Sequence, residues 1–247
     1  MTENAFEAVR GRDDSRLLFL CDHASNALPE GGLGLDPALL STHIAYDIGA
    51  AAMTRALAKA YGAPALLGVW SRLLIDLNRG ADDPTIVMKL SDGSIIPGNV
   101  LGDAKADTAE VAHRVRTFHA PYHAAIGAAL DRMGADATII SVHSFTPAWK
   151  GRARPWEIGV LYDRDMRLSA PLMARLHEAG FTVGDNEPYT GALEGDTLYR
   201  HGTLRGLPHV LIEIRQDLIA SEDAAQGFAL RLKTILDLAL DDMHRQG

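Results

Sequence analysis

The chain has 247 residues and a formal net charge of −8, with 47% hydrophobic and 23% charged residues. A chain of this length and composition can fold around one α/β core without a disulfide or a structural metal, and its negative charge argues against nucleic acid as a partner. It has no apolar stretch near the roughly 20 residues that span a bilayer, so we expect no membrane partner. Since its start has no apolar segment and the chain has one cysteine, we expect no secretory signal and a cytoplasmic location.

The first third of the chain predicts three strands and one helix. Residues 1–15 are polar, and we expect them to be loose. The unbroken apolar run Leu17–Cys21 predicts a short buried strand. Residues 36–62 predict a helix, because an Asp-Pro pair starts the segment, alanine fills it and a glycine follows it. Two further strands are expected at Ala65–Trp70 and Leu73–Leu77.

The remainder alternates strands and helices between two long polar loops. Residues 105–133 have a helical pattern, which Pro121 should kink or divide. The other expected elements are loops at 80–103 and 184–206, strands at Ala137–Val142, Trp156–Tyr162 and His209–Ile214, and helices at 166–179 and 221–244. This alternation predicts a layered α/β domain with a mostly parallel sheet.

Polar residues cluster directly after apolar strands at four places in the sequence. In open α/β sheets, ligands bind at the carboxyl ends of the strands, so we expect the four clusters to surround one cleft. They are Asp22-His23-Ala24-Ser25-Asn26, Asp76-Leu77-Asn78-Arg79, His143-Ser144 and Glu213-Ile214-Arg215.

Two strand-end histidines, His23 and His143, are candidate metal ligands. The alternative is that each is a hydrogen-bonded loop histidine. Asp47 is the candidate third ligand, since a carboxylate among apolar residues is costly unless it is partnered; a capping or salt-bridge role would also explain it. His119 and His123 form a rival pair with i, i+4 spacing, but no glutamate follows His119, so a structural or cleft-lining role is favoured for both.

A buried base and a set of arginines complete the expected chemistry. Glu213 lies in an apolar strand, where burial raises the pKa of a carboxyl group towards the range useful for acid–base catalysis. A structural Glu213–Arg215 pair is the alternative. Arg72, Arg79, Arg200 and Arg215 lie in or beside the polar clusters and suggest a carboxylate substrate, although any one of them could form a surface salt bridge.

Motifs along residues 16–220 resemble the N-formylglutamate amidohydrolase family. The matching segments run in the order found in the family. They are CDHASNALP (21–29), HIAYDIGA (43–50), SRLLIDLNR (71–79), SDGSIIPGN (91–99), PYHAAI (121–126), SVHSFTP (141–147), NEPYTG (186–191) and IEIRQDLI (212–219). The family is similar to zinc carboxypeptidases and aspartoacylases, and the resemblance implies a phosphorylase/hydrolase-like three-layer α/β/α sandwich with a mixed, mostly parallel sheet.

The resemblance also implies roles for the metal-site residues. His23 and His143 match the two zinc-binding histidines, and Glu213 matches the catalytic base. Carboxypeptidases have an acidic ligand three residues after the first histidine, where this chain has the neutral Asn26. We therefore expect Asp47 to supply the third ligand of one zinc ion per monomer.

The expected substrate-binding residues follow from the same comparison. Asn78 and Arg79 match an Asn-Arg pair that binds the substrate carboxylate. Arg72 or Arg215 would serve a second anionic group or the oxyanion. The full set expected to bind substrate is Arg72, Asn78, Arg79, Arg215, Ser144 and His201.

The function implied by the resemblance is zinc-dependent hydrolysis of the amide bond of an N-formyl amino acid. N-formyl-L-glutamate, a small anionic substrate, would give formate and L-glutamate, as in histidine degradation. The alternatives are an amidohydrolase acting on another N-acyl amino acid or small amide, or a non-catalytic small-molecule binding protein. We expect residues 1–247 to form one amidohydrolase domain that is a monomer or a small homo-oligomer.

Overall fold

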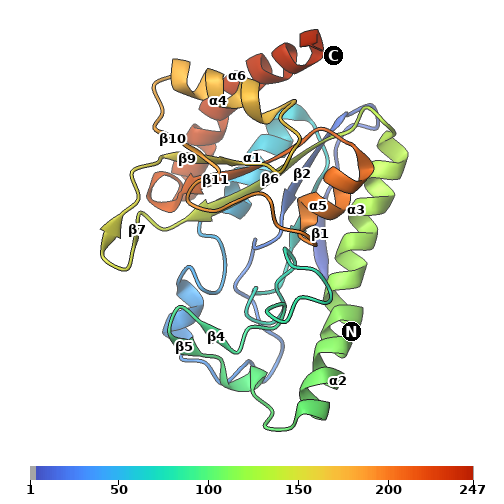
Figure 1. Cartoon of the computed structure of the whole chain (residues 1–247), viewed down its shortest axis with the longest axis vertical. Coiled ribbons are helices and arrows are strands. Elements are labelled where there is room, and N and C mark those ends of the chain that lie inside the picture. The colour runs from blue at the N-terminus through green and yellow to red at the C-terminus, as the bar shows by residue number, and fades with distance from the viewer. Residues whose placement is uncertain (1–3, 247) are drawn as a thin grey trace.

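A seven-stranded sheet forms the centre of the computed structural model, which describes residues 4–246 (Figure 1). The strand order is β1-β3-β2-β6-β11-β9-β10, and β3, β2, β6 and β11 run parallel to one another. β1 and β9 are antiparallel to their neighbours β3 and β11. The strands are β1 (Phe6–Val9), β2 (Leu17–Cys21), β3 (Ala65–Gly68), β6 (Thr138–Phe145), β9 (Ile158–Leu161), β10 (Val183–Asp185) and β11 (His209–Arg215).

Helices cover both faces of this sheet, which confirms the expected three-layer α/β/α fold. One face packs against α1 (Ala50–Tyr61), α4 (Ser169–Glu178) and α6 (Glu222–Gln246), and the other against α3 (Ala120–Met133) and α5 (Thr197–His201) (Figure 1). Successive strand residues alternate between the two cores, as in β2, where Phe19 and Cys21 face α1 while Leu18 and Leu20 face α3. No helix in residues 4–246 combines the length and the apolar character of a membrane span.

The helix expected over residues 36–62 is much shorter in the structure. Residues Pro37–Ser41 form only a 3₁₀ turn, η1, whose first N–H groups are capped by Asp36, and α1 begins at Ala50. Gly49 adopts a left-handed conformation with φ of 82°, and a side chain there would lie 2.2 Å from the backbone oxygen of Ile219. The irregular segment between these helices carries Asp47 to the carboxyl edge of the sheet.

The strand expected at Leu73–Leu77 is a series of turns instead. The carbonyl oxygen of Leu73 accepts a hydrogen bond from Asn99 Nδ2 at 2.8 Å, and that of Leu74 accepts one from Arg114 Nη1 at 2.8 Å. Side chains thus satisfy the backbone groups that a neighbouring strand would otherwise bind. The preceding strand, expected to reach Trp70, ends at Gly68.

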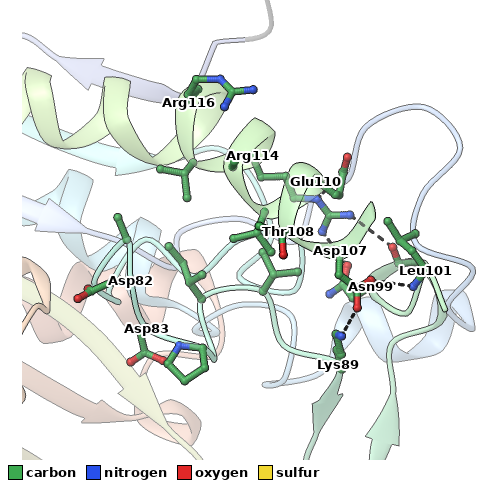
Figure 2. A pocket seen from close by; sticks show the side chains of 18 residues that line it. Asp82, Asp83, Lys89, Asn99, Leu101, Asp107, Thr108, Glu110, Arg114 and Arg116 are labelled. Carbon is green, nitrogen blue, oxygen red and sulfur yellow. Dashed lines mark hydrogen bonds and ion pairs between the residues drawn. The ribbon is translucent and has the colours of Figure 1, made fainter. Parts of the chain in front are cut away.

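Residues expected to form the loop 80–103 enclose a cavity of about 580 Å³ against α2 (Ala104–Arg114) (Figure 2). This segment contains the hairpin β4 (Leu90–Ser91)–β5 (Ser94–Ile95) and the 3₁₀ turn η2 (Pro97–Asn99). The charged groups of the cavity pair with each other: Arg114 Nε lies 2.8 Å from Glu110, and Lys89 binds Asp107. This cavity is larger than the one at the strand ends, but four of its charged side chains are paired with one another.

Three further segments differ from expectation. Residues 6–9, which fall in the segment expected to be loose, form edge strand β1, because Phe6 packs 6.4 Å from the ring of Tyr122. The helix that Pro121 was expected to kink or divide is interrupted before the proline by a π turn, η3 (Val115–His119), and continues as α3. The expected loop 184–206 contains α5 and the end of β10. The remaining elements are the hairpin β7 (Ala148–Trp149)–β8 (Arg152–Ala153) and the 3₁₀ turns η4 (Thr203–Arg205) and η5 (Gln216–Leu218).

Candidate active site

Three neighbouring parallel strands deliver the main polar side chains of the site. β2 pairs with β6, and β6 pairs with β11. His23 follows the end of β2, whereas His143 and Glu213 are direct register partners in β6 and β11. Because register partners project from the same face of a sheet, His143 and Glu213 lie on the same side. Strand pairing therefore brings together residues that are far apart in the sequence.

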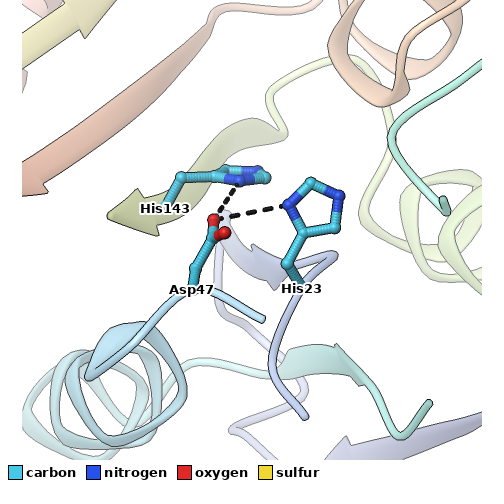
Figure 3. Close-up of side chains that lie close together, drawn as sticks. All are labelled: His23, Asp47 and His143. Carbon is cyan, nitrogen blue, oxygen red and sulfur yellow. Dashed lines mark hydrogen bonds and ion pairs between the residues drawn. The ribbon is translucent and has the colours of Figure 1, made fainter. Parts of the chain in front are cut away.

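His23, Asp47 and His143 form a buried cluster that could hold a metal ion (Figure 3). Asp47 Oδ2 lies 2.8 Å from His143 Nδ1 and 3.4 Å from His23 Nδ1. The three residues offer one donor atom each within 4.8 Å of the others. Two imidazole nitrogens and a carboxylate oxygen are a ligand set used by catalytic zinc sites.

Two aspartates that were not among the expected site residues orient these histidines. His23 Nε2 donates to Asp76 Oδ1 at 2.7 Å, and His143 Nε2 donates to Asp22 Oδ2 at 3.1 Å. A carboxylate behind a metal-binding histidine fixes the ring and its tautomer. Both aspartates belong to the polar clusters noted in the sequence, and Asp22 directly precedes His23, so their place in these clusters was the available signal.

The hydrogen bonds of the cluster provide a test of whether it suits a cation. Since both Nε2 atoms donate to carboxylates, a neutral imidazole would direct its Nδ1 lone pair at Asp47 Oδ2, which is also an acceptor. Protons on Nδ1, or a cation between the three atoms, remove this repulsion. Burial lowers the pKa of His143, but its hydrogen bonds to Asp22 and Asp47 raise that pKa well above its ordinary value. A divalent metal would displace these protons, and the donor set fits one.

Arg72 lines the cleft and balances the negative charge of the aspartates. Its Nη2 donates to Asp76 Oδ2 at 2.8 Å, and its Nη1 lies 3.5 Å from Asp47 Oδ1. Burial alone would raise the pKa of Asp76, but the charge of Arg72 lowers it well below its ordinary value. Asp76 therefore stays ionised and can accept the hydrogen bond from His23 Nε2.

Glu213 is a buried carboxyl group with an unsatisfied oxygen. The residue is 6% exposed, and Oε2 has no hydrogen-bond partner among the described residues. Burial raises its pKa to about 7. The alternative of a Glu213–Arg215 pair is wrong, because Arg215 Nε donates to Asp217 at 2.8 Å in the following 3₁₀ turn. Glu213 is thus left with an oxygen that can exchange a proton.

A cleft of about 380 Å³ lies beside this cluster. Asn78 Oδ1 accepts a hydrogen bond from the backbone N–H of Thr197 at 3.0 Å. The amide nitrogen of Asn78 therefore points away from Thr197. The guanidinium of Arg79 makes no hydrogen bond or ion pair with any residue in 4–246. The cleft is lined by His23, His43, Asp47, Arg72, Asp76, Asn78, Arg79, His143, Ser144, Phe145, Thr146, Leu161, Tyr189, Thr190, Leu193, Asp196, Leu211 and Glu213.

Three residues expected to bind substrate are placed differently from what the sequence suggested. Ser144 lines the cleft, but its hydroxyl donates to the carbonyl oxygen of Ile48 at 2.8 Å. Arg215 does not line the cleft and pairs with Asp217. His201 is buried outside the cleft, in α5. Neither Arg215 nor His201 is therefore placed to contact a ligand in this cleft.

A row of three buried histidines fixes the backbone around Asn78. His201 Nε2 donates to His123 Nδ1 at 3.0 Å, and His123 Nε2 donates to the carbonyl oxygen of Leu77 at 3.0 Å. His119 Nε2 donates to the carbonyl oxygen of Arg79 at 2.9 Å. Burial lowers the pKa of His123 to about 3, so this ring stays neutral and can accept from His201. The rival metal pair His119 and His123 thus supports the loop that carries Asn78 and Arg79.

Replacing His123 with Leu should lower the free energy of unfolding by about 1–3 kcal/mol, because the carbonyl oxygen of Leu77 would be buried without a donor. Urea unfolding of the two proteins measures this difference. His123→Gln is the matched control, since its side-chain amide can still donate to Leu77. Equal stability of the Leu variant and the unmodified protein would show that the histidine row is not structural.

Comparisons with known proteins identify the family of this chain. A family model for N-formylglutamate amidohydrolase matches residues 15–220. The chain is similar to the crystal structure of a gene product of Agrobacterium tumefaciens, with 34% identity, a TM-score of 0.88, and coverage of 98% of this chain and 97% of the other. The comparison with curated proteins gave no match.

Two more distant solved structures share the fold. One is N-formylglutamate amidohydrolase from Ralstonia eutropha, with 22% identity, a TM-score of 0.63, and coverage of 97% of each chain. The other is a bacteriophage poly-gamma-glutamate hydrolase, with 10% identity, a TM-score of 0.53, and coverage of 100% of this chain and 93% of the other. Because the family model matches most of the sequence, the chain belongs to the N-formylglutamate amidohydrolase family.

Proposed function

We propose that this protein is a zinc-dependent amidohydrolase that cleaves the C–N amide bond of N-formyl-L-glutamate to give formate and L-glutamate. The observation that carries this proposal is the content of one cleft. The cleft contains the cluster of two histidines and one carboxylate. It also contains the buried carboxyl group of Glu213, whose Oε2 has no hydrogen-bond partner, and the guanidinium of Arg79, which has none among residues 4–246. These are the groups that hydrolysis of an anionic amide requires.

His23, Asp47 and His143 would hold one zinc ion per monomer. Nitrogen and oxygen donors of this kind suit zinc, and the carboxylates of Asp22 and Asp76 keep both histidine rings in position. A bound zinc ion polarises a carbonyl group and lowers the pKa of water. Arg72 offsets the charge of Asp47 and Asp76, and its partly exposed guanidinium faces the cleft where negative charge would develop on the substrate oxygen.

Glu213 would act as the general base and acid. With a pKa of about 7, its carboxyl group can take a proton at Oε2 from the attacking water and return it to the leaving amine. Oε2 is the atom without a hydrogen-bond partner in the described part of the chain, so accepting this proton breaks no existing bond.

Asn78 and Arg79 would bind the α-carboxylate of the substrate. The Arg79 guanidinium offers paired donors, and the neighbouring Asn78 amide can donate to the same group. The histidine row holds the backbone on both sides of Asn78, which positions these two donors relative to the metal cluster. The α-carboxylate would thus be fixed while the formyl group reaches the cluster.

Hydrolysis assays on protein stripped of metal and reloaded with zinc test this function. We expect zinc-dependent release of formate and L-glutamate from N-formyl-L-glutamate, measured by NMR. Faster turnover of N-acetyl-L-glutamate would favour an amidohydrolase for other N-acyl amino acids. Binding of zinc and substrate without turnover would identify a non-catalytic binding protein.

Replacing Arg79 with Lys should weaken substrate binding by roughly 1.5–3 kcal/mol, because lysine keeps the charge but loses the forked pair of donors. The effect should appear as a higher KM for N-formyl-L-glutamate. Formamide, which has no carboxylate, should show a much smaller change.

Arg215→Lys is the matched control, since Arg215 lies outside the cleft and pairs with Asp217. Its KM should stay near that of the unmodified enzyme. If Arg79→Lys and Arg215→Lys behave alike with both substrates, Arg79 does not bind the substrate carboxylate.

A further inference from the structure

A further arginine, outside the set expected from the sequence, contacts residues that line the cleft. Arg154 follows β8, and its guanidinium lies 5.8 Å from the ring centre of Phe145, 5.5 Å from that of Trp149 and 5.2 Å from that of Tyr189. Phe145 and Tyr189 both line the cleft. Aromatic faces stabilise a cation and hold it in place without neutralising its charge.

The hydrogen bonds of Arg154 use one of its nitrogens and involve uncharged acceptors. Nη1 donates to Thr146 Oγ1 at 3.1 Å, to the Thr146 carbonyl oxygen at 3.5 Å and to Tyr189 Oη at 3.2 Å. Within residues 4–246, Nε and Nη2 have no hydrogen-bond partner, and no carboxylate forms an ion pair with this guanidinium. Arg154 therefore keeps two donor groups and a full positive charge.

An unpaired cation is notable in a protein with a net charge of −8. Most other arginines near the cleft are already paired: Arg72 with Asp47 and Asp76, and Arg215 with Asp217. Among the arginines that line the cleft or contact its lining residues, Arg79 and Arg154 are the two without an ion pair in the described part of the chain. Two such cations at one cleft match a ligand with two separate carboxylates.

We propose that Arg154, together with Tyr189, binds the side-chain carboxylate of the substrate and makes the enzyme selective for acidic N-formyl amino acids. Tyr189 Oη accepts a hydrogen bond from Arg154, so its own proton is free to be donated to the same carboxylate. The inference builds on the proposed function, in which Arg79 takes the α-carboxylate. It replaces the expectation that Arg72 or Arg215 would serve the second anionic group.

Arg154→Met tests the proposal, because methionine keeps the length and the apolar contact with the aromatic rings but removes the charge and the donors. On the zinc-loaded enzyme, kcat/KM for N-formyl-L-glutamate should fall by about tenfold to a hundredfold, the range expected for a lost charged hydrogen bond. The value for N-formyl-L-glutamine, which has the same shape without the charge, should change by less than about threefold. The kcat/KM of Arg154→Lys for N-formyl-L-glutamate should lie between the values for the unmodified enzyme and Arg154→Met.

Arg152→Met is the matched control for the loss of one positive charge. Arg152 lies in the same hairpin but is exposed, so its substitution should leave the preference for glutamate over glutamine unchanged. If Arg154→Met unfolds thermally like the unmodified protein and keeps the same preference for N-formyl-L-glutamate over N-formyl-L-glutamine, the proposal is overturned. This holds even if N-formyl-L-glutamate is hydrolysed.

Calorimetric titration with L-glutamate and L-glutamine separates this inference from the proposed function. If the unmodified protein hydrolyses neither formyl substrate, the proposed function fails, but Arg154 must still make binding of L-glutamate tighter than binding of L-glutamine. Loss of that difference in Arg154→Met supports the carboxylate site. If the unmodified protein shows no such difference, Arg154 does not recognise a side-chain carboxylate.

Discussion

Asp47→Asn should remove most of the bound zinc and lower turnover of N-formyl-L-glutamate by more than about 100-fold, the upper end of the loss caused by changing a residue behind a metal ligand. The substitution preserves the shape of the side chain, so folding should be retained. It removes the anionic oxygen that lies 2.8 Å from His143 Nδ1 and 3.4 Å from His23 Nδ1. Metal content by mass spectrometry and turnover at saturating substrate measure the two effects.

Asp76→Asn is the matched control for this variant. Asp76 is also buried and also contacts His23 and Arg72, but it binds the histidine nitrogen that points away from the cluster. The substitution Asp76→Asn should lower zinc affinity or activity by about 10- to 100-fold. An effect of Asp47→Asn no greater than that of Asp76→Asn would mean that Asp47 supports the histidines and is not itself a metal ligand.

The central strands of the sheet could be predicted from local sequence because they are continuous apolar runs, whereas the edge strands β1 and β10 were not predicted. The strand expected at Leu17–Cys21 has the same bounds in the structure, and that expected at His209–Ile214 is extended by one residue. The errors lie where long-range contacts decide the backbone. Leu73–Leu77 is as apolar as a strand, but Asn99 and Arg114, which follow it in the chain, bind its carbonyl groups. Such contacts leave no pattern in the segment itself.

The candidate metal cluster could be predicted because each histidine lies in or directly after a buried strand, and because Asp47 would be costly in apolar surroundings without partners. The expected helix around Asp47 was wrong, yet the reason for choosing this residue holds in the structure, where it contacts His23, His143 and Arg72. Asp22 and Asp76 were missed because the sequence shows which polar residues follow a strand but not which of them contact one another.

The arginines proposed to bind substrate were harder to predict, since the sequence cannot show which guanidinium groups are already paired. Arg215 belongs to a strand-end cluster, but an aspartate two residues later occupies its donors. Arg154 belongs to no such cluster and reaches the cleft through the hairpin β7–β8 and its aromatic contacts. Free donors can be recognised only once all the tertiary contacts are known.

Glu213→Gln should lower kcat by at least the roughly 100-fold typical of losing a general acid–base group, while zinc content and fold are kept. The change is isosteric, and Oε2 of Glu213 makes no hydrogen bond in residues 4–246 that the amide would break. KM should change little, since the substrate carboxylates bind to other groups. Stopped assays at saturating N-formyl-L-glutamate, with metal analysis of the same samples, measure this effect.

Asp196 is the rival base, because it also lines the cleft and burial raises its pKa to about 7. One of its oxygens, however, accepts the backbone N–H of Tyr199 at 2.6 Å and caps α5. Since asparagine caps a helix about as well as aspartate, Asp196→Asn should keep both fold and kcat. Near-normal turnover in Glu213→Gln, together with a large loss in Asp196→Asn, would transfer the catalytic role to Asp196. The opposite result would assign the catalytic role to Glu213, whose Oε2 makes no hydrogen bond among the described residues.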